Sequence, residues 1–420
     1  MKSEKYVTAI DFFPFYYCRH IDEVESFFFQ PIMISNRSRV RPLILHMNLC
    51  SLYYLTGDYE KSLQTCQKAL DIYQKYYGMS HPSTAGAYNN LAVIQYTMGN
   101  VDEGINCLKI AQDIFKKVDG ENHPHVANTY STMCAIYDGM GNYQEALKMI
   151  ENSIRIYENT YGTHHLQLAS PYNNCAGVYE SLRRYDESLI SYHMALEVYR
   201  HNRAEKNPEV AILYCNLGKV YRSMDSLSMA EDYYLKAIRF FNDISAENHP
   251  DLALAYSNLG KVKQKQALYQ EAIDYTEKAL EINLSKFGNE HERIGINYSN
   301  LGLYYRLQGN FTRALEYFSL ALPILENASG VKHHLVGICV SNIGIIYAKQ
   351  GKYIEAFELF DRAFQIDAGK GIYDSELREI AVLMNESLRK ASSSKHKDIA
   401  TIKQKYELMS KSYPEIFENN

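Results

Sequence analysis

Apolar and polar side chains along this chain follow the spacing of an α-helix. Over residues 88–95, Tyr88, Leu91, Ala92 and Gln95 fall at positions i, i+3, i+4 and i+7, which share one face of a helix. The same arrangement returns over residues 298–305. A second stretch with helical spacing follows each of these, with small side chains at Ser62, Gly104, Ala146, Ser188, Ala230, Ala272, Ala314 and Ala356. The pattern predicts successive pairs of helices.

A turn between the two predicted helices recurs every 42 residues. Its eight copies begin at Gly57, Gly99, Gly141, Arg183, Asp225, Ala267, Gly309 and Gly351, without an insertion or deletion. A loop position keeps the same period, at His81, His123, His165, Asn207, His249, His291 and His333. Because a helical hairpin can cover its apolar faces only with neighbouring hairpins, the repeat predicts an all-α fold, an α-solenoid of about eight hairpins with capping helices.

The repeat also predicts how the chain is divided. Residues 43–378 hold the eight repeats, and residues 379–420 are expected to form C-terminal capping helices and a tail. Residues 1–42 do not fit the repeat and contain the aromatic run 27–29, followed by basic residues. Two interpretations of this segment remain open. It is either a cap that covers the first repeat or a segment that docks a partner.

Several motifs resemble a known family. An aromatic residue, a leucine and a small residue at helical spacing are followed by a Gly-x-Tyr turn, and the loop at 78–82 reads Gly-Met-Ser-His-Pro. With Asn89-Asn90-Leu91 in the first helix, the chain resembles tetratricopeptide repeat proteins of the kinesin-light-chain type, although its period exceeds the usual 34 residues. The resemblance implies a right-handed solenoid whose first helices line a concave groove.

One polar stripe on the first helices lies opposite the face expected to pack. At one of its positions, seven of the eight repeats carry asparagine: Asn48, Asn90, Asn174, Asn216, Asn258, Asn300 and Asn342. Each amide offers both a donor and an acceptor, so it can pair with a peptide backbone of any sequence. The family resemblance implies that these residues grip an extended peptide. The alternative is that each amide bonds a neighbouring helix and orders the stack.

The C-terminal half of this stripe is basic. Lys219, Lys261 and Lys265 lie on it, Arg222 and Arg306 lie at its edge, and none of its positions in any repeat holds Asp or Glu. The pattern predicts a non-enzymatic scaffold or adaptor that binds an extended, acidic protein or peptide segment in the groove. A second hypothesis is a structural subunit of a larger motor, ciliary or signalling assembly, which would use the convex face and the caps.

Composition excludes several other classes. The formal net charge of −5 gives no general attraction to nucleic acid, and the absence of a long apolar run argues against membrane insertion. The eight scattered cysteines are typical of reduced thiols in the cytoplasm. No phosphate-binding loop or nucleophile elbow occurs, and the loop histidines of successive repeats lie too far apart to share a zinc ion. We therefore expect no catalytic residue, metal or cofactor, while the oligomeric state stays open.

Overall fold

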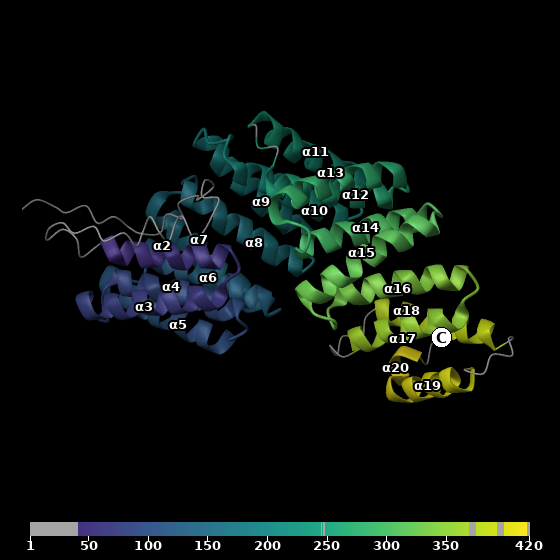
Figure 1. The fold of residues 1–420 in the computed structure, drawn as a ribbon. Coiled ribbons are helices and arrows are strands. Elements are labelled where there is room, and N and C mark those ends of the chain that lie inside the picture. The colour runs from purple at the N-terminus through teal and green to yellow at the C-terminus, as the bar shows by residue number, and fades with distance from the viewer. Residues whose placement is uncertain (1–40, 245, 247, 369–374, 393–398, 418–420) are drawn as a thin grey trace, which may run out of the picture. The chain divides into compact units, whose positions relative to one another are not determined.

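The computed structural model describes residues 41–244, 246, 248–368, 375–392 and 399–417 (Figure 1). The predicted N-terminal cap or docking segment therefore lies outside the described residues, apart from its last two positions. The described secondary structure is entirely helical and confirms the predicted all-α solenoid. The described residues form two compact units, which divide between residues 205 and 206.

The N-terminal unit contains four helical hairpins. In chain order its helices are α2 (Arg41–Leu55), α3 (Tyr59–Tyr77), α4 (Pro82–Thr97), α5 (Val101–Asp119), α6 (Pro124–Gly139), α7 (Tyr143–Tyr161), the 3-10 turn η1 (Leu166–Leu168), α8 (Ala169–Ser181) and α9 (Tyr185–His201). Even-numbered helices are the first helices of their repeats, and odd-numbered helices are the second. Each first helix packs against the second helix of its own repeat and of the preceding one.

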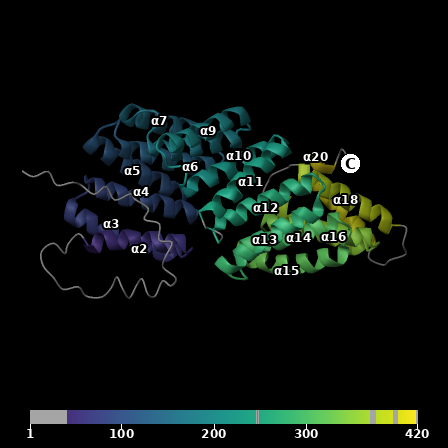
Figure 2. The same cartoon turned by 90° about the horizontal axis from the view of Figure 1, so that it is seen from above.

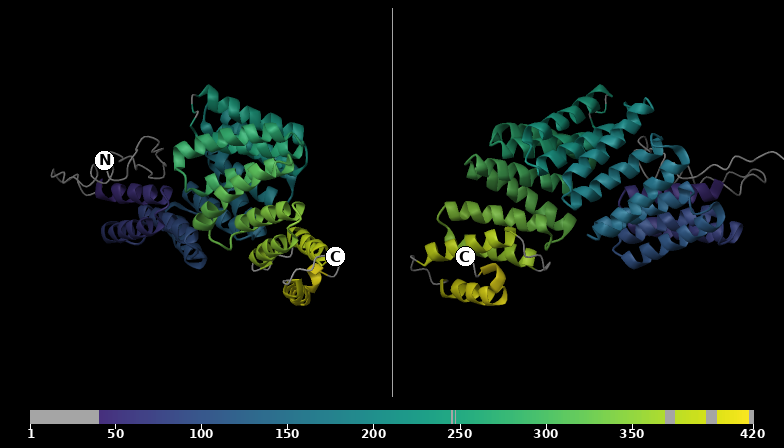
Figure 3. Two further views of the ribbon diagram at one scale, coloured as in Figure 1. Left: turned by 45° about the vertical axis from the view of Figure 1, so that its right-hand side comes forward. Right: turned by 180° about the vertical axis from the view of Figure 1, so that it is seen from behind.

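The C-terminal unit continues the same order along the chain with four more hairpins and three further helices. Figures 2 and 3 give further views of the ribbon. Its helices are α10 (Pro208–Ser223), α11 (Leu227–Asp243), α12 (Pro250–Lys265), α13 (Tyr269–Phe287), α14 (Glu292–Leu307), α15 (Phe311–Ser329), α16 (His334–Lys349), α17 (Tyr353–Ala368), α18 (Ser375–Ala391), α19 (Ile399–Ser412) and α20 (Pro414–Phe417).

Small residues in the first helices set how closely the two helices of a hairpin approach. In the seventh repeat, a Cβ added at Gly302 would lie 2.8 Å from Cε1 of Phe318, whose side chain is fully buried. Gly218 and Gly344 stand in the same relation to Tyr234 and Phe360. The aromatic ring of the second helix thus lies directly against the backbone of the first helix, which only glycine allows here.

The turn between paired helices requires a left-handed backbone in every repeat. Five copies use glycine, for example Gly309 with φ of 85°. Arg183, Asp225 and Ala267 hold the same position with φ of 58–60°, a conformation that costs non-glycine residues about 1–2 kcal/mol. The 42-residue period is therefore kept by backbone geometry even where the glycine is missing.

The loop histidines begin the first helices. Nδ1 of His291 accepts the backbone N–H of Arg293 at 3.1 Å, and His81, His123, His165, His249 and His333 make the equivalent bond. Asn207 makes the same bond in the fifth repeat through its amide oxygen. Proline follows the cap as the first helical residue at Pro82, Pro124, Pro208 and Pro250, as expected for a residue without an N–H group.

The C-terminal end of the repeats differs from the predicted boundary. Residue 378 lies inside α18, which begins at Ser375 and packs on α17 as the first helix of a further repeat would. Leu377, Ala381 and Met384 are fully buried on one face of α18. The predicted boundary at residue 378 therefore falls within a helix, after the repeat pattern has weakened and before the helical packing ends.

Candidate functional site

The asparagine stripe reaches the surface in both units. Asn48 is exposed on α2, Asn90 and Asn174 are half-buried on α4 and α8, and in the C-terminal unit Asn216, Asn258 and Asn300 are half-buried on α10, α12 and α14. Asn342 on α16 is buried, with 9% of its surface exposed. The amide of Asn300 has its nitrogen buried without a hydrogen-bond partner among the described residues. Most of the ladder is thus accessible from solvent, and one member carries an unused donor.

Asn342 is used within the fold. Its amide nitrogen donates to the carbonyl of Ile338 at 2.8 Å, and its amide oxygen accepts a hydrogen bond from Nε of Arg306 at 2.9 Å. Burial lowers the pKa of the Arg306 guanidinium, an effect that the nearby carboxylate of Glu379 opposes. Two of the predicted binding residues therefore satisfy each other, and at this position the structural interpretation of the ladder holds.

Two lysines near the stripe are neutralised by carboxylates of the same unit. Nζ of Lys265 lies 3.0 Å from a carboxylate oxygen of Asp225, which belongs to the turn before α11. Lys263 is 7% exposed and contacts Glu231 at 2.8 Å and Glu271 at 3.0 Å. The sequence analysis missed the Lys263 cluster, because nothing in a helical wheel shows that carboxylates of α11 and α13 converge on this one lysine.

Arg222 and Lys261 form the basic centre of the stripe. Lys261 is half-buried on α12, and burial together with the positive charge of Arg222 on α10 lowers the pKa of its ammonium group. Nε of Arg222 is buried and has no hydrogen-bond partner among the described residues. Neither cation forms an ion pair with a carboxylate in the described part of the chain, in contrast to Lys263 and Lys265. The two like charges are held together without compensation.

The surroundings of this basic centre combine apolar and polar groups. Leu254, one turn before Asn258 on the same stripe of α12, has 45% of its surface exposed. Lys219 is exposed on α10. Burial raises the pKa of the Tyr304 hydroxyl on α14, and the positive charge of Arg222 opposes this rise. Three consecutive first helices therefore contribute to one site with excess positive charge.

The chain matches one known protein family over most of its length. The tetratricopeptide repeat family matches seven overlapping stretches of the chain: residues 42–100, 83–159, 126–201, 167–243, 209–285, 251–327 and 293–369. The chain belongs to the tetratricopeptide repeat family. Such repeats form protein-interaction scaffolds, and the match indicates no enzymatic family. No curated protein sequence matches the chain significantly.

Solved structures with low sequence identity share the fold. A signal transduction ATPase with numerous domains and a tetratricopeptide repeat sensor, PH0952 from Pyrococcus horikoshii, has a TM-score of 0.56 at 16% identity over 83% of this chain and 53% of its own. The apo form of RapI has a TM-score of 0.51 at 17% identity, covering 68% of this chain and 97% of its own. BtubC (BKLC) from P. vanneervenii has a TM-score of 0.46 at 20% identity, covering 53% and 88%.

The described helices also bear on the membrane prediction. Among them, none combines the length and the apolar character that a bilayer crossing requires.

Proposed function

We propose that this chain is a scaffold that binds an extended, acidic peptide along the asparagine stripe of the C-terminal unit. The observation that supports this most directly is the uncompensated pair of Arg222 and Lys261. A carboxylate placed between them would relieve the repulsion that lowers the pKa of Lys261, and it would accept charge-assisted hydrogen bonds from both. Family members form interaction scaffolds, and the proposal adds the chemistry of the ligand.

The spacing of the first helices suits an extended ligand. Packed helices lie about 8–10 Å apart, and an extended chain advances about 3.3 Å per residue. Asn216, Asn258 and Asn300 would therefore each meet about every third residue of the peptide backbone. Leu254 would contact an apolar side chain of the peptide, while Arg222 and Lys261 select an acidic one.

The proposed setting is the cytoplasm. Seven cysteines of the described residues are free, and most are buried. Burial raises the pKa of several of these thiols, including that of Cys134 to about 12, which keeps them protonated and unreactive. Free thiols of this kind are typical of intracellular proteins.

A peptide-display selection followed by titration of single peptides tests the proposal. We expect acidic peptides to be enriched and their affinity to fall at least tenfold in Lys261→Met and in Arg222→Met. Lys265→Met is the matched control, because that lysine lies on the same stripe of α12 but is already paired with Asp225. It should change affinity several-fold less.

A second pair of variants tests the backbone contacts. Asn216→Ala combined with Asn258→Ala should remove binding while helicity and melting stay unchanged. The proposal fails if acidic peptides are not enriched, or if Lys261→Met and Lys265→Met weaken binding equally. If partner capture survives all these variants and is lost on deletion of residues 1–42, the chain acts instead as a subunit held through its end.

A further inference from the structure

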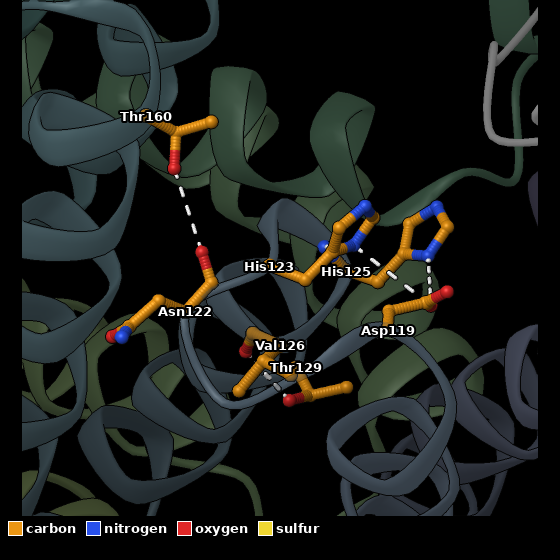
Figure 4. Close-up of polar contacts among 7 residues, drawn as sticks. All are labelled: Asp119, Asn122, His123, His125, Val126, Thr129 and Thr160. Carbon is orange, nitrogen blue, oxygen red and sulfur yellow. Dashed lines mark hydrogen bonds and ion pairs between the residues drawn. The ribbon is translucent and has the colours of Figure 1, made fainter.

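A cluster of three metal-ligating side chains lies at the junction of α5 and α6, away from the basic stripe. Asp119 is the last residue of α5, His123 caps α6 and His125 follows in its first turn. Nδ1 of His125 lies 2.9 Å from a carboxylate oxygen of Asp119, and Nδ1 of His123 lies 3.8 Å from the same oxygen (Figure 4). One ligand atom from each residue falls within 4.8 Å of the others.

This cluster departs from the repeat at two positions. The cap histidine recurs in other repeats, and in three of them an aromatic residue four positions earlier stacks on it: Tyr77 on His81, Tyr161 on His165 and Phe287 on His291. In the third repeat this aromatic residue is replaced by Asp119. The slot of His125 holds Ser83, Gln167, Glu209, Asp251, Arg293 and Leu335 elsewhere. A carboxylate at the first of these slots and an imidazole at the second thus occur together in this repeat alone.

We infer that Asp119, His123 and His125 form a binding site for a divalent transition-metal ion of the zinc class. Two imidazoles and one carboxylate are a ligand set that Zn²⁺ accepts, and Co²⁺ and Ni²⁺ also bind such sets. In a tetrahedral site with bonds of about 2.1 Å, ligand atoms lie about 3.4 Å apart. The observed separations of 2.9 and 3.8 Å bracket this value, so the ligands need only small movements.

The ligands are held in place before any metal arrives. The loop between the helices is short, and its Gly120 takes a φ of 96° to let the chain turn. The backbone N–H of His123 donates to the carbonyl of Gly120 at 3.2 Å, and the hydroxyl of Thr160 on α7 donates to the carbonyl of Asn122 at 3.4 Å. The ring of Phe115 packs on His125 with a centroid distance of 4.8 Å. These contacts fix the backbone of the loop and one imidazole.

Metal binding replaces two existing hydrogen bonds. The metal takes the place of the hydrogen shared by Asp119 and His125, and the neutral His125 ring then carries its hydrogen on Nε2. Nδ1 of His123 gives up the cap bond to the backbone N–H of His125 and binds the metal instead. The side chain of His123 is 37% exposed, so solvent can supply the fourth ligand. Three protein ligands with one open position are the arrangement found in catalytic and exchangeable zinc sites.

The test compares the full-length protein with variants that borrow residues from other repeats. His125→Ser and Asp119→Tyr introduce the side chains that the second repeat carries at these slots, so the hairpin should keep its fold. After treatment with a chelator, each protein is titrated with Co²⁺, followed by visible absorption, and with Zn²⁺, followed by calorimetry. The wild type should bind one more equivalent than either variant, with at least tenfold higher affinity for that equivalent.

A matched control is Asp251→Ser. Asp251 lies 3.5 Å from the cap histidine His249 but has no second imidazole beside it, so this change should leave the extra equivalent in place. His125→Gln, with the residue of the fourth repeat, is a further variant if His125→Ser melts early in the chelator. The inference is overturned if the wild type binds no more metal than His125→Ser and Asp119→Tyr, or if no visible Co²⁺ band develops. The cluster is then a hydrogen-bonded anchor for the loop.

Discussion

Replacing Gly302 by alanine tests whether ring-to-backbone packing sets the spacing within a hairpin. The new Cβ would lie 2.8–2.9 Å from three ring atoms of Phe318, where an ordinary carbon contact is about 3.5–4.0 Å. The ring belongs to a fully buried side chain. Overpacking of this kind costs about 1–3 kcal/mol, and the higher helix propensity of alanine offsets about 1 kcal/mol. We expect a net loss of up to about 2 kcal/mol in the free energy of unfolding.

Other repeats carry different residues at the slots of Gly302 and Phe318, and these natural combinations suggest a variant that should restore stability. In the second repeat, the same two slots hold Ala92 and Leu108, both fully buried. Phe318→Leu alone should cost about 1–2 kcal/mol through lost volume, but combined with Gly302→Ala it should cost less than the two changes add up to. The fourth repeat holds Ala176 with Tyr192, which shows that a hairpin can open to take both groups and limits the expected cost.

Urea unfolding followed by circular dichroism measures the three variants. The chain has two compact units, so urea unfolding alone does not show which part of the chain has lost stability. Hydrogen exchange measured for residues 292–329 then shows whether the loss of stability lies in the seventh repeat. A coupling of about 1 kcal/mol between the two changes would support the reasoning. Additive effects within about 0.5 kcal/mol would refute it.

Three further predictions concern the turn, the caps and the basic centre. Ala267→Gly should stabilise the C-terminal unit by about 0.5–1 kcal/mol, because relief of the left-handed φ outweighs the added backbone entropy of the unfolded chain. Thermal melting measures this change in stability. Gly309→Ala should destabilise the same unit. Burial and the charge of Arg293 lower the pKa of the His291 imidazole, which caps α14 only while Nδ1 is unprotonated. The cap contributes about 1 kcal/mol to the free energy of unfolding. This contribution is fully present above pH 6.5 and is lost as the pH falls through the lowered pKa of His291. In urea titrations between pH 7 and pH 5, His291→Asn should remove that part of the pH dependence. Lys261→Met should raise the melting temperature, with a gain in stability on the order of 1 kcal/mol, while it weakens acidic-peptide binding. A destabilised variant would contradict the claim that the charge of Lys261 is uncompensated.

Much of the fold was predictable because each repeat carries the same local sequence patterns. The helical spacing, the proline after the loop and the left-handed turn are encoded within a few neighbouring residues, and the 42-residue period repeats them. The prediction of the solenoid followed from the need of each hairpin for neighbours. The predicted C-terminal boundary at residue 378 falls inside α18, which packs on α17 without carrying the repeat's sequence signature.

The site was only partly predictable. The asparagine stripe and its lysines can be read from a helical wheel, and most of these residues do reach the surface. A wheel treats Lys261, Lys263 and Lys265 as three similar cations. The charged groups around the three lysines differ. Lys263 and Lys265 contact carboxylates from outside α12, whereas Lys261 lies near a second cation, Arg222.

The sequence by itself therefore determined the architecture, since helix period, turns and hairpin stacking depend on local and periodic features. It also indicated most of the stripe residues that reach the surface. Only the tertiary structure decided which polar groups are already satisfied, as Asn342 is by Arg306, and which are left without a partner, as Nε of Arg222 is. It also placed Asp119, His123 and His125 around one point. Pairing depends on distances of a few ångströms between side chains, and helical spacing along the chain does not specify those distances.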